Sequence, residues 1–550
     1  MTLKTTVSGL VAQSVAKHVS HAFALMGNGN AWFLDALAKT QVEVTAVRHE
    51  AGTVAAADAY HRVSGKLAVA TTTYGPGFTN AITPLAEAAQ ARTPLVLVTG
   101  DAPTPGPRAW DVDQAAIAAA VGVPTFTVDA SSAGKVTVEA IHHALAHRTP
   151  VVLAIPYDLA PQAVESEAIP DLPALPAPLA PEPEAVARAA AVLTSARRPL
   201  VLAGRGAKAA AAELHGLVGK LRALTASTAP ARGLFAGQPW DLGGAGGFAS
   251  EASGSLIKQA DAVLVVGAGL NQFTTAFGHA FAPDAAIIQV DIAEARTNPL
   301  VTDFVRGDAL LAVKALAEAL GEPVSSREPW QGTVSEAKNS RHHFDREPGE
   351  VAAPDGRLDP RSAMRQLNDI LPTNRVVASD GGHFIGWANT YFDLPAADSI
   401  TLVGTAYQSI GLGLPSAVGA AVARPDATVV AVTGDGGGLM ALPDLDSLIR
   451  TARSAVVLVF NDAAYGAEVH QYGSQGLDQE IMRINQVDFA LAGASFGAQS
   501  AVIQTLDDLA AVQAWVDGGA SGTFVADLRV SGGVVAPYIL EIIEATLKKQ

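Results

Sequence analysis

Two aspartates that each follow a run of β-branched residues are the side chains of this sequence best suited to hold a metal ion. Asp435 lies in TVVAVTGDGGG, and Asp462 follows VVLVFN. The neighbouring glycines are Gly434, Gly436, Gly437 and Gly438. Their missing side chains let backbone N–H groups approach a phosphate. Because the carboxylate of Asp435 would repel that phosphate, a bridging Mg²⁺ is expected, since it binds carboxylate, carbonyl and phosphate oxygens.

A glycine-rich turn alone can also be a tight turn with a purely structural role. The prediction of a metal site therefore depends on the second aspartate. One β-α-β unit brings the ends of two adjacent parallel strands together. Asp435 and Asp462 would then meet at one edge of a sheet. The pair therefore indicates a metal-bridged diphosphate site.

The elements that position these residues repeat along the whole chain. β-Branched runs alternate with Ala/Leu-rich helical stretches, and continuous apolar runs favour parallel strands covered on both faces. The clearest runs are LAVATTT, PLVLVTG, PVVLAIP, PLVLAG, ADAVLVVGAG, AAIIQVDI, RVVASDGG, ATVVAVTGDG and SAVVLVFND. The predicted fold class is α/β, with three doubly wound parallel-sheet domains.

Two stretches without apolar periodicity separate these blocks. Residues 161–185 are rich in proline, and residues 322–356 are polar and charged, as extended connectors are. We expect an N-terminal domain over 1–165, a central domain over 185–322 and a C-terminal domain over 357–550.

Composition excludes several kinds of site and partner. The 550 residues include no cysteine, which excludes disulfides, zinc-thiolate sites, iron–sulfur clusters and a cysteine nucleophile. A net charge of −16 argues against nucleic acid as a partner, since phosphate binding needs clustered Lys and Arg. Neither a signal peptide nor a membrane span is predicted, because the N-terminus lacks a compact apolar run and residues 400–423 carry polar residues and Pro415. We expect a cytoplasmic protein.

The two aspartate motifs together resemble those of the thiamine-diphosphate (ThDP) enzymes of the acetohydroxyacid synthase and pyruvate decarboxylase superfamily. These enzymes carry Gly-Asp-Gly and, one β-α-β unit later, Asn-Asn or a close variant. The resemblance covers nearly the whole chain, and it implies pyrimidine-binding, central and diphosphate-binding domains in that order. It implies that Asp435, Asp462 and the backbone carbonyl of Ala464 bind Mg²⁺. The family usually has Asn at the second position, so the extra charge of Asp462 would bind the cation harder or alter its protonation balance.

An N-terminal segment is similar to a second motif of the same family. In RHEAGTVAAADAYHRVSGKLAVATTTYGPGFTN, Glu50 opens a helix and a Gly-Pro-Gly turn follows the next strand. The resemblance implies that the Glu50 carboxyl hydrogen-bonds N1′ of the cofactor pyrimidine and favours the imino tautomer whose N4′ removes the C2 proton. Partial burial would raise the pKa of Glu50 and help it share that proton. Without the family, Glu50 is an acidic residue in a first helical turn, where Glu is favoured.

Further cofactor contacts follow from the segment GTAYQSIGLGLPSAVGAAVA and the loop SDGGHF. The resemblance implies that Ile410 holds the cofactor in its bent shape, and that the backbone at Gln408 and Ile410 bonds the aminopyrimidine. Gly382 and His383 would contact the diphosphate, although His383 as a solvated loop residue is the alternative. Tyr465 and Gly466 complete the expected cofactor-binding set.

Six positions correspond to substrate-facing residues in the family. They are Asn30, Thr73, Tyr74, Gln114, Glu468 and His470. The alternatives are core packing for Tyr74 and a helix-surface position for Gln114. No active-site His pair of the decarboxylase type is present.

The resemblance implies a ThDP- and Mg²⁺-dependent carboligase or lyase acting on a small 2-oxo acid, similar to acetolactate synthase. Loss of CO₂ would leave an enamine, which is then transferred to a carbonyl acceptor. A simple 2-oxo acid decarboxylase, a C–C hydrolase and an aldehyde lyase are the alternatives. A non-catalytic ThDP-binding homologue is a further one, against which Glu50 argues.

Two more expectations concern the central domain and the assembly. GAGLNQFTTAFGHAF is neutral where the flavin-binding relatives carry an acidic, Arg-containing stretch, so FAD is not expected, and an ADP-like ligand stays open. Because Glu50 and Asp435 lie on different domains, the family builds each site between two subunits. The expected assembly is a homodimer or homotetramer.

Overall fold

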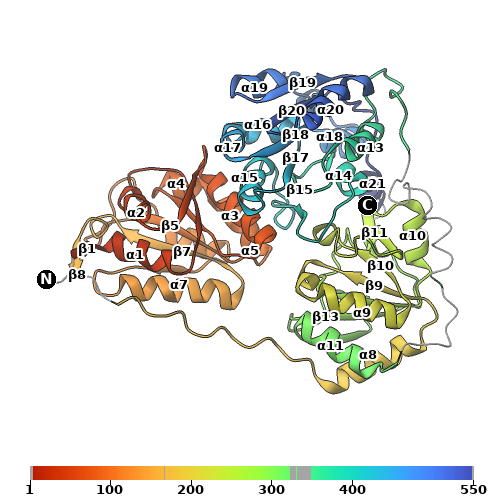
Figure 1. The fold of residues 1–550 in the computed structure, drawn as a ribbon, viewed down its shortest axis with the longest axis horizontal. Helices are drawn as coiled ribbons and strands as arrows, with labels where there is room; N and C mark the ends of the chain where they lie inside the picture. The colour runs from red at the N-terminus through yellow and green to blue at the C-terminus, as the bar shows by residue number, and fades with distance from the viewer. Residues whose placement is uncertain (1–3, 166–167, 323–329, 331–347, 548–550) are drawn as a thin grey trace.

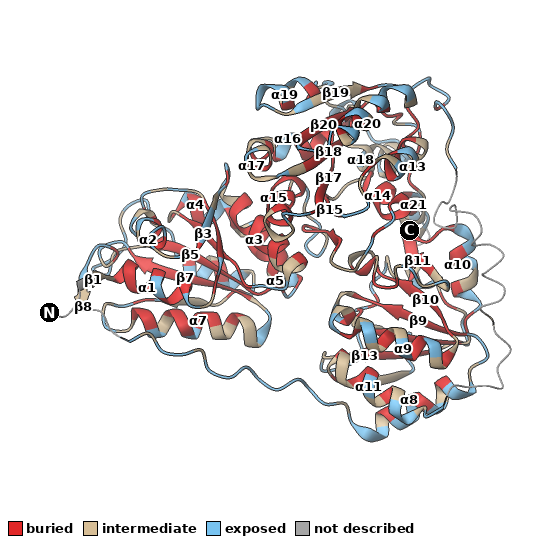
Figure 2. Ribbon diagram, in the orientation of Figure 1, coloured by how far each residue is buried: buried red, intermediate tan, exposed pale blue. Residues whose placement is uncertain are grey.

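Each third of the chain folds around its own six-stranded parallel sheet, flanked by helices (Figure 1). The structure is a computed structural model that describes residues 4–165, 168–322, 330 and 348–547. All of the apolar runs proposed as strands form strands of these sheets, and Figure 2 shows their residues buried. The predicted class, α/β with three doubly wound parallel-sheet domains, is confirmed.

The N-terminal sheet has the strand order β3-β2-β4-β5-β7-β6. Its strands are β2 (His21–Ala24), β3 (Glu43–Ala46), β4 (Val69–Thr72), β5 (Leu95–Asp101), β6 (Thr125–Thr127) and β7 (Pro150–Pro156). Its helices are α1 (Val7–Ala16), α2 (Ala31–Leu37), α3 (Glu50–Ser64), α4 (Pro76–Asn80), α5 (Ile82–Gln90), α6 (Gln114–Ala120) and α7 (Ala133–His147). A short antiparallel pair, β1 (Lys4–Thr6) with β8 (Ala163–Glu165), ties the two ends of this domain together. The strand order reverses between β2 and β4, which is where open α/β sheets receive ligands.

The central sheet has the order β11-β10-β9-β12-β13-β14. Its strands are β9 (Pro199–Ala203), β10 (Leu224–Ser227), β11 (Asp241–Gly244), β12 (Ala262–Val266), β13 (Ala286–Asp291) and β14 (Asp303–Arg306). The helices are α8 (Pro183–Ser195), α9 (Ala211–Leu221), α10 (Glu251–Lys258) and α11 (Ala309–Ala319), with the 3₁₀ turns η1 (Arg205–Ala210), η2 (Ala229–Ala231), η3 (Gly246–Phe248) and η4 (Ala276–Gly278). Its strand order reverses between β9 and β12.

The C-terminal sheet has the order β16-β15-β17-β18-β20-β19. Its strands are β15 (Arg375–Ser379), β16 (Ile400–Thr401), β17 (Thr428–Gly434), β18 (Ser454–Phe460), β19 (Gln499–Ile503) and β20 (Gly522–Leu528). Its helices are α13 (Pro360–Ile370), α14 (Ile385–Tyr391), α15 (Gly413–Ala423), α16 (Asp435–Met440), α17 (Pro443–Thr451), α18 (Gly466–Gln471), α19 (Phe489–Ser495), α20 (Ala510–Asp517) and α21 (Pro537–Leu547). Three 3₁₀ turns complete it, η6 (Gly473–Gln475), η7 (Glu480–Met482) and η8 (Leu506–Leu509). Its strand order reverses between β15 and β17.

The segments between domains differ in how much of them is described. Residues 168–182 carry no helix or strand and run as an extended trace to α8 (Figure 1). Of the predicted connector over 322–356, residues 323–329 and 331–347 lie outside the described residues. The domain boundaries themselves stay predictions. None of the helices in the described ranges combines the length and the apolar character needed to cross a bilayer.

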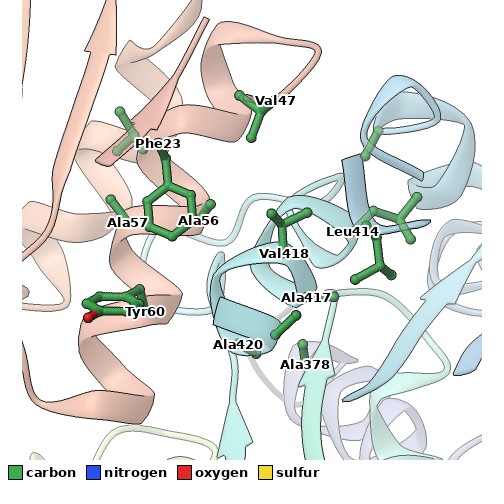
Figure 3. Close-up of a cluster of buried hydrophobic side chains, with 14 of the residues drawn as sticks. Phe23, Val47, Ala56, Ala57, Tyr60, Ala378, Leu414, Ala417, Val418 and Ala420 are labelled. Carbon is green, nitrogen blue, oxygen red and sulfur yellow. The ribbon is translucent and has the colours of Figure 1, made fainter. Parts of the chain in front are cut away.

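Helix α3 of the N-terminal domain packs directly against α15 of the C-terminal domain (Figure 3). Small residues allow this close approach, since a Cβ at Gly419 would lie 2.0 Å from the carbonyl oxygen of Ala56. The resulting cluster of buried side chains is shared by both domains, with Tyr60 and Val418 on its two sides. The helix that begins at Glu50 is therefore held by the domain that carries Asp435.

A buried charge cluster adds to this contact. Arg62 on α3 forms ion pairs with Asp58 at 2.6 Å and Glu87 at 2.9 Å, and both carboxylates are fully buried. The guanidinium of Arg62 also donates to the carbonyl oxygen of Leu402, and Glu87 accepts from the backbone N–H of Tyr407. The N-terminal domain thereby fixes the turn of the C-terminal domain that carries Gln408 and Ile410.

Candidate active site

The two aspartates lie at the ends of neighbouring strands, as the sequence predicts. Strands β17 and β18 pair in parallel, with Gly434 opposite Phe460. Asp435 is 3% exposed, and its carboxylate accepts from the N–H of Gly436 at 2.8 Å and of Ala463 at 2.7 Å. Ala463 has a φ of 60°, a left-handed conformation that costs energy for a residue with a Cβ. This strained turn brings Asp462 next to Asp435.

Burial and mutual repulsion make this pair of carboxyls suited to a cation. Burial, followed by the charge of Asp462, raises the pKa of Asp435 to about 7. Burial raises the pKa of Asp462 to about 6. A divalent cation relieves both effects, because it replaces lost hydration and neutralises two charges. The Asp435 and Asp462 carboxylates, with the Ala464 carbonyl beside them, form an all-oxygen donor set that fits Mg²⁺.

These aspartates line a cavity at the switch point between β15 and β17. Its lining includes Glu468 and eleven of the twelve predicted cofactor and metal residues, all except Gln408: Gly382, His383, Ile410, Gly434, Asp435, Gly436, Gly437, Asp462, Ala464, Tyr465 and Gly466. Gly436 is needed for its missing side chain, since a Cβ there would lie 2.7 Å from the ring of Tyr465. The structure thus brings together most of the cofactor set that the sequence predicts, while the role of each residue stays a prediction.

Asp380, which the sequence analysis did not single out, organises the walls of this cavity. Its buried carboxylate accepts from the N–H groups of Gly381, Gly411 and Leu412 at 2.8 to 3.3 Å. Burial raises the pKa of Asp380 to about 6. The carboxylate therefore ties the loop after β15 to the turn that carries Ile410. The sequence signal that could have identified Asp380 is its position directly after a predicted buried strand, in the loop SDGGHF.

The loop after β15 is held in shape from the C-terminal segment. The hydroxyl of Tyr538 donates to the carbonyl oxygen of Gly382 at 2.7 Å, and Gly382 has a φ of 130°, which favours glycine. His383 Nε2 accepts from the N–H of Ala536 at 2.8 Å, so Nδ1 carries the ring proton. Burial lowers the pKa of His383 to about 3, which keeps its ring neutral. The N–H groups of Gly382, His383 and Phe384 have no acceptor within the described part of the chain, so they can bind a phosphate oxygen.

Ile410 and Gln408 occupy the turn before α15. Ile410 lines the cavity and is 38% exposed, so part of its side chain is open to a bound molecule. Gln408 has a φ of 63°, another left-handed residue beside the site. Strain of this kind persists where the surrounding contacts fix the backbone, and it gathers at functional sites.

Glu50 begins α3 as predicted, but it is not among the residues that line the cavity. Its Oε2 accepts from Asn80 Nδ2 at 3.0 Å. Its Oε1 faces the Gly-Pro-Gly turn, since a Cβ at Gly77 would lie 3.5 Å away. Within one chain the candidate activating carboxyl and the metal cavity are therefore separate features.

The predicted substrate residues of the N-terminal domain lie around its switch point. Asn30 is buried, and its side chain accepts from Gly27 N–H and donates to Leu25 O and Thr71 Oγ1. Thr73 Oγ1 accepts from Gly29 N–H at 2.8 Å. Buried Gln114 accepts from Gly75 N–H and donates to Gly100 O and Asp101. These contacts hold the loops in place. Tyr74 differs from the other residues because its hydroxyl accepts hydrogen bonds but donates none within the described residues.

Glu468 and His470 lie on α18, the helix that begins at Gly466 after the second aspartate. Glu468 lines the cavity with the aspartates. His470 lines a neighbouring cavity that shares Asp462, Ala464 and Gly466, and its Nε2 is buried with no partner in the described structure. Burial lowers the pKa of His470, and its ring lies 4.7 Å from that of His383. Both predicted positions are therefore near Asp435 and Asp462.

Comparison with known proteins gives the same assignment for all three domains. Residues 5–120 match the description "Thiamine pyrophosphate enzyme, N-terminal TPP binding domain", residues 186–316 match its central domain, and residues 380–523 match its C-terminal TPP binding domain. The chain is 28% identical to sulfoacetaldehyde acetyltransferase of Roseovarius nubinhibens over 98% of this chain and 94% of that one. It is 29% identical to the acetolactate synthase isozyme 2 large subunit of Escherichia coli over 90% of each chain. It is 30% identical to pyruvate oxidase of Lactiplantibacillus plantarum, over 86% of this chain and 79% of the relative.

Proposed function

The chain belongs to the thiamine pyrophosphate enzymes, and we propose that within this family it is a Mg²⁺-dependent carboligase or lyase that acts on a small 2-oxo acid. The observation that carries the proposal is the pair of carboxyls of Asp435, which is buried, and Asp462, which is half-buried, beside a loop whose N–H groups have no acceptor among the described residues. Two carboxylates at that place need a cation, and the free N–H groups need an anion. A metal-bound diphosphate meets both needs.

Each residue has a separate task in this proposal. Asp435, Asp462 and the carbonyl of Ala464 hold Mg²⁺, while Gly382, His383 Nδ1–H and Gly466 approach the diphosphate. When bound, the cofactor supplies a carbanion and an electron sink for loss of CO₂. Glu50 holds or releases a proton at the pyrimidine nitrogen, and Asn80 fixes its other oxygen. Ile410 would offer the cofactor an apolar surface in the cavity.

We further propose that the active site is completed by a second copy of the chain. Glu50 does not line the cavity of its own chain, and exposed apolar side chains lie near the cavity and near the Gly-Pro-Gly turn that faces Glu50. Ile410 and Met440 adjoin the cavity, and Trp110 adjoins the turn at Gly75. Such exposed groups are typical of surfaces that a partner covers.

Mixing inactive variants tests this arrangement. Glu50→Gln and Asp435→Asn should each be inactive alone, but a mixed dimer contains one site with neither substitution. Random mixing should restore about a quarter of the wild-type activity, since half of the dimers are mixed and each has one intact site. Mixed samples as inactive as the single variants would contradict a shared site.

The central domain is proposed to hold no FAD. At its switch point, the turn after β9 donates from Gly204 to Val266 O and from Gly206 to Gly267 O. The chain's own backbone thus fills the place where such sheets bind a dinucleotide. Purified protein should lack flavin absorbance, and a stoichiometric flavin peak would overturn this part of the proposal.

The reaction itself is tested with a panel of 2-oxo acids. Protein with ThDP and Mg²⁺ is incubated with each acid, with and without an aldehyde, and CO₂ and products are identified by mass. Hydroxyketone products would support a carboligase, and free aldehyde alone would support the simple decarboxylase. No product from any acid would refute the proposed function.

A further inference from the structure

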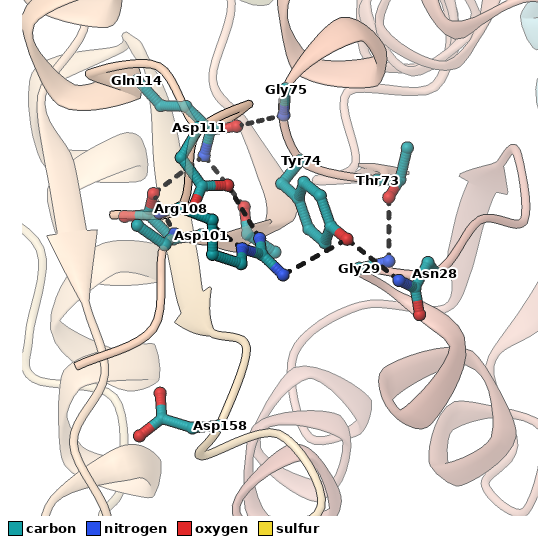
Figure 4. A network of polar contacts seen from close by, with 12 residues as sticks. Asn28, Gly29, Thr73, Tyr74, Gly75, Asp101, Arg108, Asp111, Gln114 and Asp158 are labelled. Carbon is teal, nitrogen blue, oxygen red and sulfur yellow. Dashed lines mark hydrogen bonds and ion pairs between the residues drawn. The ribbon is translucent and has the colours of Figure 1, made fainter. Parts of the chain in front are cut away.

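Tyr74 has a hydroxyl whose proton meets no acceptor among the described residues, and it stands next to the turn that faces Glu50. Tyr74 follows β4 and directly precedes Gly75-Pro76-Gly77, the turn that faces Glu50 Oε1. Asn28 lies in the loop after β2, on the other side of the switch point between these two strands. Figure 4 shows the Tyr74 ring between Asn28 and Arg108. The group therefore occupies the ligand-receiving edge of the N-terminal sheet.

The Tyr74 oxygen accepts two hydrogen bonds. Asn28 Nδ2 donates to it at 2.9 Å, and Arg108 Nη1 donates at 3.4 Å. A phenol oxygen accepts through its lone pairs and keeps one proton to donate. Within the described residues no acceptor takes that proton. The hydroxyl is therefore free to donate to a bound molecule.

Surrounding contacts fix the Tyr74 ring. The Arg108 guanidinium lies 4.4 Å from the ring centre, and Tyr157 meets the ring edge-on at 5.9 Å. Arg108 is itself held by Asp111 through bonds of 2.9 and 2.7 Å. A hydroxyl fixed in this way loses little conformational freedom when a ligand binds.

The charges around Tyr74 discriminate between kinds of ligand. The guanidinium of Arg108 is already paired with Asp111, and Asp101 and Asp113 add two more acidic groups. Burial, with the charges of Asp111 and Asp113, raises the pKa of Asp101. An anion placed here would meet repulsion, whereas a neutral carbonyl oxygen would accept the free O–H without that cost.

We propose that Tyr74 donates a hydrogen bond to the carbonyl oxygen of a neutral aldehyde or ketone that serves as the acceptor substrate, with Asn28 and Arg108 as positioning residues. This rests on the proposed function, which supplies the nucleophilic carbon. When that carbon bonds to the acceptor carbonyl carbon, the C–O π pair moves onto the oxygen that Tyr74 contacts. Water supplies the proton that completes the new hydroxyl. Overall, one 2-oxo acid anion, one aldehyde and one proton give CO₂ and a hydroxyketone.

The experiment measures separately the two stages of the reaction, the release of CO₂ from the donor acid and the transfer to the acceptor. Wild type and Tyr74→Phe are loaded with ThDP and Mg²⁺ and given the 2-oxo acid that the panel identifies, with acetaldehyde as the acceptor. The ratio of hydroxyketone formed to CO₂ released should fall about tenfold or more in Tyr74→Phe, the effect of losing one hydrogen bond to a developing charge. Asn28→Ala should lower the same ratio by a smaller factor. Tyr157→Phe, which keeps the ring that packs on Tyr74, should leave the ratio within about twofold, as expected when no hydrogen bond is lost.

Each other outcome is decisive. Equal losses of hydroxyketone and CO₂ in Tyr74→Phe, or an equal fall of the ratio in Tyr157→Phe, would overturn the inference. A wild-type enzyme that releases CO₂ but transfers nothing to acetaldehyde, or that prefers the anionic acceptor glyoxylate, would also overturn it. No CO₂ from any 2-oxo acid would refute the proposed function and the inference with it.

Discussion

Replacing Asp462 with Asn tests whether the two carboxyls share one divalent cation. Burial and the charge of Asp462 raise the pKa of Asp435 to about 7, and burial raises that of Asp462 to about 6. A cation that binds both oxygens must displace their protons, so its affinity rises with pH until both are ionised. Asp462→Asn keeps one oxygen ligand but removes a titrating group and its repulsion on Asp435.

The size of the pH effect follows from these pKa values. Titration at about 7 and about 6 leaves both carboxyls ionised in roughly three-quarters of the molecules at pH 7.5 and in under about 1% at pH 5.5. The association constant of wild type for Mg²⁺ should therefore rise about 100-fold between these pH values. In Asp462→Asn only Asp435 titrates, and its pKa is no higher than before, so the rise should be no more than about 25-fold.

The assay is titration of Mg²⁺ in the presence of ThDP at pH 5.5, 6.5 and 7.5. Trp387 lines the cavity, so its fluorescence reports binding, and calorimetry gives a second reading. Asp507→Asn replaces an exposed carboxylate outside the site and is the matched control. Its association constant for Mg²⁺ should rise with pH as in wild type. An association constant for Mg²⁺ that rises equally with pH in wild type and in Asp462→Asn would refute the proposal that the two carboxyls share one cation.

The same shifts have a consequence for stability without metal. Because both pKa values are raised in the folded chain, it binds more protons than the unfolded chain between about pH 4 and 7. Metal-free protein should lose stability as pH rises through this window. Added Mg²⁺ should therefore raise the Tm more at pH 7.5 than at pH 5.5.

Three further substitutions test the supports of the site. Tyr538→Phe removes the donor to Gly382 O and should raise the ThDP dissociation constant about three- to tenfold by calorimetry; an unchanged constant would contradict this support. Arg62→Ala leaves two buried carboxylates unpaired and should lower the free energy of unfolding in urea by about 3–5 kcal/mol, and a loss below about 1 kcal/mol would count against it. Gly419→Val places a Cβ against the Ala56 carbonyl and should cost about 1–3 kcal/mol by thermal unfolding, whereas Gly216→Ala, which meets open space, should cost nothing; equal effects would reject the helix contact.

The sequence predicts those features that depend on local pattern. Continuous apolar runs such as 428–434 and 454–460 are typical of buried parallel strands, so the pattern alone places Asp435 and Asp462 at one sheet edge. The start of α3 at Glu50 is equally local, because an acidic residue is favoured in a first helical turn. The identity of the cofactor came from the resemblance to the family, because two carboxylates indicate a metal-bound diphosphate without identifying it as ThDP.

Long-range contacts lie beyond what the sequence pattern can predict. Tyr538 reaches Gly382 across 156 positions, and Glu87 reaches Tyr407 across 320 positions. No periodicity encodes such pairings, because they depend on how the domains pack. For the same reason the sequence could not show that the polar atoms of Asn30 and Gln114 would be used by neighbouring loops.

The most direct test of the account is cofactor binding and turnover in Glu50→Gln and Asp435→Asn side by side. We expect Glu50→Gln to bind ThDP and Mg²⁺ with near wild-type affinity and to release no CO₂ from the preferred 2-oxo acid. Asp435→Asn should lose binding itself, with the fold kept as judged by the Tm. Full CO₂ release by Glu50→Gln, or unchanged Mg²⁺ and ThDP binding by Asp435→Asn, would contradict the assignment of this site.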